Sequence, residues 1–317
     1  MGGGSWTRDA FNTYTTVTKG MSLSYGGTGS TTYTTDALNA VTADMINCAC
    51  TTIDDSYGVQ EMFKARTLDP MLNPKNVIRE CLDTEEHPNT VPIILALDVT
   101  GSMGDTAVEV AKKLNVIMTK LYDQISDVEF MIMGIGDLSY DQFPIQASQF
   151  ESDIRIAEQL DKVYFEFGGG GNMFESYTAA WYFGARHTRL DCWKRGKKGI
   201  IITMGDERLN PYLPVSGRYS GLASATGDVL QDSVETKDLY SEVSEKFDVY
   251  HLHVNHGYNF DEAGIKASFK WYLDDKHFRE VNLDNIADEI VNIIVASTES
   301  QNNIAGVTKN ENGEITW

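Results

Sequence analysis

Short apolar runs alternate with segments of helical periodicity along most of this chain, and this alternation restricts the possible folds more than any other feature. Four runs are apolar on both faces, as strands inside a parallel sheet must be; they read VPIILALDV, VEFMIMGIGD, KGIIITMGD and FDVYHLHV. Helical segments lie at 105–125, 146–163 (after a short strand or turn), 172–187, 233–247, 258–273 and 283–297. The alternation predicts right-handed β-α-β crossovers, and therefore an α/β, Rossmann-like fold with a mostly parallel central sheet and helices on both faces.

Composition divides the 317 residues into an N-terminal arm, a main domain and a tail. The segment from 1 to about 60 is rich in Gly, Ser, Thr and Tyr and poor in the aliphatic side chains that a core needs. Such a segment is weakly ordered, or becomes ordered only against another surface, although residues 36–53 have the pattern of one short helix. Prolines and several Asn and Asp residues describe an extended lead-in from Leu68. The expected divisions are arm and lead-in over 1–89, α/β domain over 90–298 and tail over 299–317.

The chain is strongly acidic, since 26 basic residues against 46 acidic ones leave a formal net charge of −20. A negative field of this size repels phosphate backbones, so we expect no nucleic-acid partner. The first residues, MGGGSWTRDAF, lack the basic and apolar regions of a signal peptide, and no later stretch is apolar for long enough to span a bilayer. The sequence therefore predicts a cytoplasmic protein without a membrane partner.

Oxygen-bearing side chains gather where two of the predicted strands end. Asp98, Thr100 and Ser102 occupy alternate positions in the turn after the first strand, where neighbouring glycines allow the backbone to curl. Asp206 closes the strand KGIIITMGD. Because functional residues of parallel sheets lie beyond the carboxyl ends of the strands, we expect these side chains to converge. Two hydroxyls and one or two carboxylates suit Mg²⁺, which prefers oxygen ligands and keeps several waters.

The run DVTGS at 98–102 resembles the D-x-[ST]-x-S signature of von Willebrand factor A domains. The metal-ion-dependent adhesion site of that family also uses a second loop and an aspartate after a later strand, and the order of elements over residues 90–298 is consistent with it. The resemblance implies a non-enzymatic protein-interaction module that binds Mg²⁺, or Mn²⁺ or Ca²⁺ in its place. The metal ligands that it implies are Asp98, Thr100, Ser102 and Asp206.

A cation in such a site recruits an acidic side chain from a partner protein. Bacterial and phage-like members of the family often serve as adaptors for AAA ATPases or within multi-protein assemblies, so the resemblance implies a partner of either kind. The long loop over 207–228 holds Tyr212 and Tyr219 on the rim of the expected site. Long loops beside a site either contact partners and set specificity, or are plain surface decoration.

The glycine-rich stretch FEFGGGGNMFESY resembles the second loop of the family, which usually reads GG-T-[PN]. It is not a phosphate-binding P-loop, because no Gly-Lys-[Ser/Thr] follows it. Where the family has its metal-binding threonine, this chain has Gly171, followed by Asn172. We expect Asn172, Glu175 or a water molecule to supply the missing oxygen.

Three other interpretations stay open. DVTGS also resembles the D-K-T-G-T motif of the haloacid dehalogenase superfamily, in which Asp98 would be a phosphoryl-accepting nucleophile. Against this, Thr100 stands where soluble phosphatases have a second aspartate, and Glu207 stands where a later glycine belongs. A hydroxyl of the run could simply cap the next helix. The chain could also be a structural subunit of a particle or filament, with its arm ordered on a neighbour.

Histidines and cysteines give weaker signals. His251 and His253 alternate on one face of the strand FDVYHLHV, where buried core histidines are more frequent than a metal-binding pair. Cys48 and Cys50 form one close pair, while the other two cysteines stand alone. A structural zinc site needs a second pair, so we expect ordinary reduced cysteines.

Overall fold

The computed structural model describes residues 4–19, 22–24, 30–32, 50–52, 62–166, 172–255, 261–305, 308–309 and 315–316. At its centre lies a sheet of six strands: β5 (Val91–Asp98), β6 (Val128–Ile135), β7 (Ile145–Ala147), β10 (Gly199–Gly205), β14 (Phe247–Val254) and β15 (Phe278–Val281). Their order across the sheet is β15-β14-β10-β5-β6-β7. All neighbours are parallel except β6 and β7, which are antiparallel.

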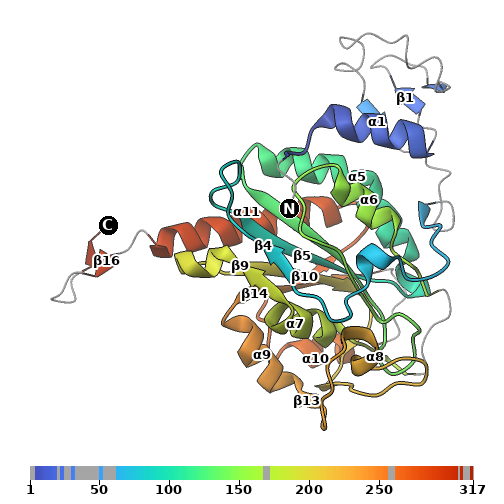
Figure 1. The fold of residues 1–317 in the computed structure, drawn as a ribbon, viewed down its shortest axis with the longest axis vertical. Coiled ribbons are helices and arrows are strands. Elements are labelled where there is room, and N and C mark those ends of the chain that lie inside the picture. The colour runs from blue at the N-terminus through green and yellow to red at the C-terminus, as the bar shows by residue number, and fades with distance from the viewer. Residues whose placement is uncertain are drawn as a thin grey trace.

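Helices cover both faces of this sheet (Figure 1), so the predicted α/β, Rossmann-like fold class is confirmed. One face carries α5 (Gly104–Tyr122), α6 (Arg155–Asp161) and α11 (Ile286–Ala305), and the other carries α7 (Tyr177–Arg186), α8 (Leu222–Thr226), α9 (Thr236–Ser244) and α10 (Glu262–Phe269). The buried residues of α5 recur every three or four positions and so face the sheet as one stripe. They include Ala107, Val110, Ala111, Leu114, Ile117, Met118 and Leu121.

The strand order reverses between β5 and β10. If the six strands are numbered along the chain and read from the β7 edge, their order is third, second, first, fourth, fifth and sixth. The connections after β5 and β10 therefore run toward opposite edges of the sheet. Ile93 pairs with Ile200 and Leu97 with Met204, so the carboxyl ends of the two strands are adjacent. Ligands of open α/β sheets bind in the crevice outside such a switch point. The topology therefore points to the loops after β5 and β10.

Short elements surround the central sheet. The parallel pair of β4 (Arg79–Cys81) and β9 (Thr188–Leu190) ties the lead-in to the main domain. The remaining strands are β8 (Phe174–Glu175) with β11 (Arg208–Leu209), β12 (Tyr212–Leu213) with β13 (Val234–Glu235), β1 (Ser22–Ser24) with β2 (Ser30–Thr32) and β3 (Cys50–Thr52), and β16 (Thr308–Lys309) with β17 (Ile315–Thr316). Short 3-10 helices lie at Pro70–Leu72, Gly101–Met103 and Asp191–Arg195. Among the described residues, no helix has both the length and the apolar character that a membrane crossing needs.

The main domain differs from the prediction in several places, including the following three. α7 begins at Tyr177 and not at residue 172, because Phe174 and Glu175 form β8. β15 was not expected: it is an edge strand with one neighbour, and only Val281 of its four residues is buried, so no apolar run marks it. α11 continues past residue 298, the expected end of the domain, to Ala305.

The start of the arm packs on the main domain. α1 (Arg8–Lys19) lies against α5, and Trp6 and Phe11 are buried in the core cluster that includes α5. Trp6 Nε1 donates a hydrogen bond to Asn115 Oδ1 at 3.1 Å. This part of the arm is therefore ordered, because it packs against α5 of the main domain.

A helix over residues 36–53 is wrong at its end, because Cys50–Thr52 form strand β3. β-Branched threonine favours a strand when a partner strand is present, and β1 is that partner. The rest of that segment, with Cys48, lies outside the described residues.

Phe11→Ala is expected to lower the free energy of unfolding by about 3 kcal/mol, because it leaves a cavity between α1 and the main domain. Phe11 is only 2% exposed, whereas Val17 on the same helix is 65% exposed. Val17→Ala therefore serves as the control, with a change within about 0.5 kcal/mol. Urea unfolding followed by circular dichroism measures both, and equal stability of the two variants would exclude α1 from the core.

Candidate metal site at the carboxyl edge of the sheet

Asp98, the last residue of β5, is fully buried. Its Oδ1 accepts hydrogen bonds from the backbone N of Thr100 at 2.9 Å and from Thr100 Oγ1 at 2.6 Å. Its Oδ2 accepts a hydrogen bond from the hydroxyl of Tyr177 at 3.0 Å. Three donors therefore fix the orientation of the carboxylate and favour its charged form.

The chain turns directly after β5 into the 3-10 helix Gly101–Met103, and then into α5. Ser102 Oγ lies 3.5 Å from Thr100 Oγ1 and donates a hydrogen bond to Asp206 Oδ1 at 3.1 Å. The backbone φ is −56° at Gly104, and neither glycine beside Ser102 has a positive φ. The predicted curl is thus right-handed and does not use the left-handed freedom of glycine.

Asp206, the first residue after β10, completes the group. Asp98, Thr100, Ser102 and Asp206 form one chain of side-chain contacts across the switch point. Asp98 is fully buried, Asp206 is 8% exposed, and Ser102 is exposed to solvent. The group is therefore closed on the side of the sheet and open at Ser102.

Negative charges crowd this group. Burial raises the pKa of Asp98 to about 7, and the neighbouring carboxylate of Asp206 adds to the shift. Burial also raises the pKa of Glu175 well above its ordinary value, with the charge of Asp98 as the next cause. The Oε2 atom of Glu175 is buried, and no residue that the structure describes forms a hydrogen bond with it. A cation held by Asp98 and Asp206 would relieve the repulsion between their carboxylates.

The donor set suits a hard divalent cation, because every candidate ligand offers oxygen. In the part of the chain that the structure describes, no three His, Cys, Asp or Glu side chains lie close enough to share a metal ion. A cation here would therefore be held by the carboxylates of Asp98 and Asp206, the hydroxyls of Thr100 and Ser102, and water. Glu175 would stay outside this set and contribute negative charge.

Asn172, which precedes β8, contacts the loop after β6. Its Nδ2 donates a hydrogen bond to Asp137 Oδ2 at 2.7 Å, and its Oδ1 accepts one from the backbone N of Phe174 at 2.8 Å. Asp137 follows β6 and is fully buried. Both ends of the Asn172 amide are thus occupied by groups other than the four converging side chains. Gly171, where the family has its threonine, lies outside the described residues.

Tyr177 is a residue of the site that the sequence analysis missed. It is fully buried at the start of α7, and its hydroxyl also accepts a hydrogen bond from the backbone N of Glu207 at 3.3 Å. A Cβ atom on Gly205 would lie 1.8 Å from that hydroxyl, so glycine at 205 makes room for it. The available signal was its position directly after the glycine-rich loop; an aromatic residue in a helix otherwise indicates only a core contact.

The weaker candidates belong to the core. His251 and His253 are fully buried, and burial lowers the pKa of both, so both are neutral. His251 Nδ1 lies 2.9 Å from Thr203 Oγ1. Cys81 and Cys192 are buried free thiols.

No protein-family model matches this chain, and no curated protein matches it. Solved structures similar to it include von Willebrand factor-type domains. The open conformation of the pilus adhesin SpaC from Lactobacillus rhamnosus GG has 12% sequence identity and a TM-score of 0.43, with 71% of this chain and 31% of that chain covered. The vWF domain of the type V pili tip protein Mfa5 from Porphyromonas gingivalis has 11% identity and a TM-score of 0.42, with 67% and 96% covered.

Proximal thread matrix protein 1 from the mussel byssus, in a structure with a zinc-occupied MIDAS motif, has 11% identity and a TM-score of 0.39. That match covers 71% of this chain and 47% of the byssus protein. The chain thus spans 31% of the adhesin SpaC and 47% of the byssus protein.

Proposed function

We propose that this chain is a protein-interaction module of the von Willebrand factor A type, extending from about residue 90 to the end of α11. In this proposal Mg²⁺ is held at Asp98, Thr100, Ser102 and Asp206, and an acidic side chain of a partner protein docks there. The observation that carries the proposal is the chain of contacts among these four side chains across the switch point, where two buried carboxylates lie close to each other.

The ligand types account for the docking. Asp98 and Asp206 would contribute the negative charge of the site, while Thr100 and Ser102 would contribute neutral oxygens and water would fill the remaining positions. Neutral ligands leave the bound ion electron-poor, so it supplies positive charge for a carboxylate from outside. Ser102 is the exposed member of the group, so we propose that the partner approaches from its side.

The loop after Asp206 would contact the partner. Tyr212 and Tyr219 are 45% and 66% exposed, and the guanidinium of Arg218 lies 5.2 Å from the centre of the Tyr219 ring. The backbone N of Arg218 donates a hydrogen bond to the carbonyl O of Ser139 at 2.7 Å, which fixes this part of the loop beside the loop after β6. Arginine and tyrosine are enriched at protein interfaces, and arginine attracts an acidic partner.

The structure gives less support to phosphoryl transfer on Asp98. A nucleophile must reach its substrate, yet Asp98 is fully buried and both of its carboxylate oxygens accept hydrogen bonds. Thr100, which stands where a phosphatase would have its general acid, is one of those donors. We therefore propose binding and not catalysis, with an adaptor or assembly role as the finer assignment.

Partner capture tests this proposal directly. Proteins retained by the immobilised wild-type chain in Mg²⁺ are expected to be lost in EDTA and with Asp98→Ala, because both remove the docking charge. Asp238→Ala, an exposed carboxylate on α9, is the control and should retain them. Partners that persist in all conditions would exclude metal docking. Multimers that grow with concentration and ignore EDTA would favour a structural subunit instead.

Asp98→Asn is expected to stabilise the metal-free protein, and more so as the pH rises. The pKa of Asp98 is about 7 in the folded protein, above that of the unfolded chain. The folded state therefore binds the extra proton, and its stability falls as the pH rises from about 4 to about 7. Ionising this buried carboxyl costs on the order of 4 kcal/mol. Thermal unfolding of both proteins in EDTA at pH 5 and pH 8 measures the growing difference.

Saturating Mg²⁺ provides the matched comparison. At pH 8 it should raise the melting temperature of the wild type, because a ligand that binds the folded state stabilises it. The melting temperature of Asp98→Asn should not change. An equal rise in both proteins would place the metal elsewhere.

Tyr177→Phe is expected to weaken Mg²⁺ binding about tenfold, because groups that orient a metal ligand typically contribute that much. The ring keeps its packing, while the hydroxyl that donates to Asp98 and accepts from the backbone N of Glu207 is lost. Tyr182→Phe is the control: Tyr182 is equally buried in α7, but its hydroxyl donates to Asp228. Calorimetric titration measures both affinities, and equal affinities would deny Tyr177 a role in positioning Asp98.

A further inference from the structure

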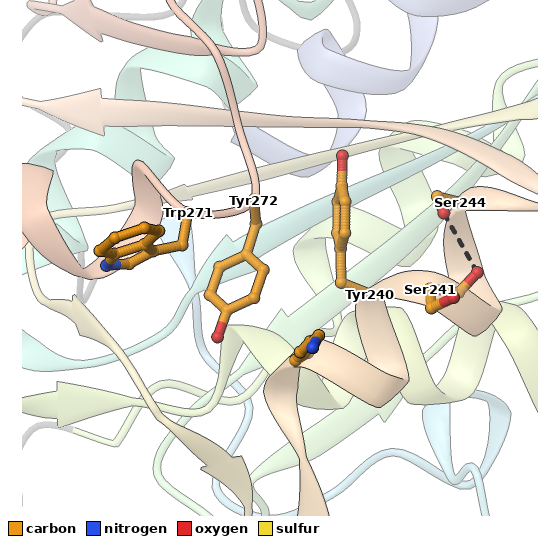
Figure 2. Close-up of a pocket in the computed structure, with 6 residues that line it drawn as sticks. Tyr240, Ser241, Ser244, Trp271 and Tyr272 are labelled. Atoms are coloured by element: carbon orange, nitrogen blue, oxygen red, sulfur yellow. Dashed lines mark hydrogen bonds between the residues drawn. The ribbon is translucent and has the colours of Figure 1, made fainter.

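A pocket between α9 and the turn that follows α10 is lined by aromatic side chains, among them Tyr240, Trp271 and Tyr272 (Figure 2). Basic and acidic groups both act on it: Lys237 lines it, while the charge of Asp274 acts on Tyr240. Because its hydroxyls accept as well as donate, its chemistry selects no single ligand. The buried ionisable groups at the amino edge of the sheet are different, because the structure shows what covers them.

The first described residues of the N-terminal arm lie over these groups. The carbonyl O of Gly4 accepts hydrogen bonds from Ser152 Oγ at 2.5 Å and from His87 Nε2 at 3.0 Å. A Cβ atom on Gly4 would lie 2.8 Å from Asp153 Oδ2, so the arm passes directly beside this carboxylate. Ser5 is exposed to solvent. The arm is therefore the outermost layer here and can lift without disturbing the sheet.

Carboxyl groups outnumber cations beneath the arm. An antiparallel bridge between Phe130 and Glu151 sets Glu129 beside Ser152, the residue that contacts Gly4. Among the described residues, the charged and titratable side chains of this group are Asp127, Glu129, Glu151, Asp153, His87, Arg155, Cys81 and Tyr122. Four carboxyls thus face one guanidinium and one imidazole, so they cannot all ionise without repulsion.

Arg155 is shared between two of these carboxyls. It donates to Asp153 from Nε and from Nη2, each at 2.8 Å, and its Nη2 lies 2.7 Å from Glu151 Oε2. Burial raises the pKa of Glu151 to about 7; Arg155 opposes this shift, and the charge of Asp153 adds to it. Glu151 therefore keeps its proton until the pH approaches 7.

Glu129 lacks a cation of its own. It is 5% exposed, and no described residue forms a hydrogen bond with its Oε2. His87 lies with its Nδ1 3.4 Å from Asp127 Oδ1. Burial raises the pKa of Glu129. Glu129 and Glu151 thus both retain protons at a pH at which exposed glutamates, with a pKa of about 4, are ionised.

We propose that Glu129 and Glu151 form a pH-sensitive latch, which holds the N-terminal arm on the main domain in acid and releases it as the two carboxyls ionise. Lifting the arm would let water reach both carboxyls, and water favours their charged form. The docked state therefore binds protons more tightly than the released state, because burial raises both pKa values.

The direction of the pH dependence follows from this linkage. Docking is strongest below about pH 4 and weakens as the pH rises to about 7, where Glu151 ionises in the docked state as well. Release would uncover the apolar surface of α5 on which Trp6 and Phe11 pack. The latch lies at the amino edge of the sheet and does not depend on the candidate metal site.

Hydrogen exchange of the backbone amides of α1, followed by mass spectrometry and corrected for the intrinsic effect of pH, tests the latch. In the wild type, protection of α1 is expected to fall about tenfold or more between pH 5 and pH 8. Glu129→Gln combined with Glu151→Gln imitates the protonated carboxyls, so it should keep the pH 5 protection at pH 8. Glu245→Gln, which changes an exposed glutamate after α9, is the control and should behave as the wild type does.

Either single glutamine variant should remove part of the pH dependence, so the test does not require the double variant to fold. Asp98→Asn separates the latch from the titration of the metal site, because it should leave the fall in α1 protection in place. Equal protection of α1 at the two pH values in the wild type, a fall that both single variants retain in full, or a fall that Asp98→Asn abolishes would each overturn the proposal.

Discussion

The rest of the structure depends on the parallel pairing of β5 with β10. This pairing brings Asp98 and Asp206, which are far apart in the sequence, to the same edge of the sheet at the point where the connections diverge. Two carboxylates that are withdrawn from water repel each other and lose solvation. Hydrogen bonds from Thr100, Ser102 and Tyr177 offset part of this cost. The cation that we propose at this site would offset the remainder.

One short helix, α10, lies between the rim of the candidate metal site and the turn at Trp271. Asp261 stands just before α10 and forms an ion pair with Arg208, in the loop that follows Asp206. Trp271 follows the other end of the same helix. The helix packs through Ile265 and Phe269 into the core. The loop after Asp206 and the turn at Trp271 are therefore joined through a helix that is packed in the core.

Sequence patterns predicted those features that burial or spacing determines. Apolar periodicity predicted the buried strands and the buried stripe of α5. The spacing of oxygen-bearing residues at the strand ends predicted that these side chains would converge. β15 has only Val281 buried, so no pattern marks it. Trp6 and Phe11 anchor α1 from within a segment whose average composition suggested little order. The contacts of Tyr177 with Asp98 and of Asn172 with Asp137 depend on the position of the glycine-rich loop and the residues after it. No local sequence pattern encodes that position.

The close approach at Gly205 limits how this sequence can vary. A methyl group at that position would overlap the hydroxyl of Tyr177, which is itself hydrogen-bonded to Asp98. An alanine at 205 is thus tolerated only after a smaller residue has replaced the tyrosine, and that replacement removes a donor from the buried carboxylate. Each of the two single substitutions, at Tyr177 or at Gly205, is therefore unfavourable. We expect the residues at these two positions to change together or not at all.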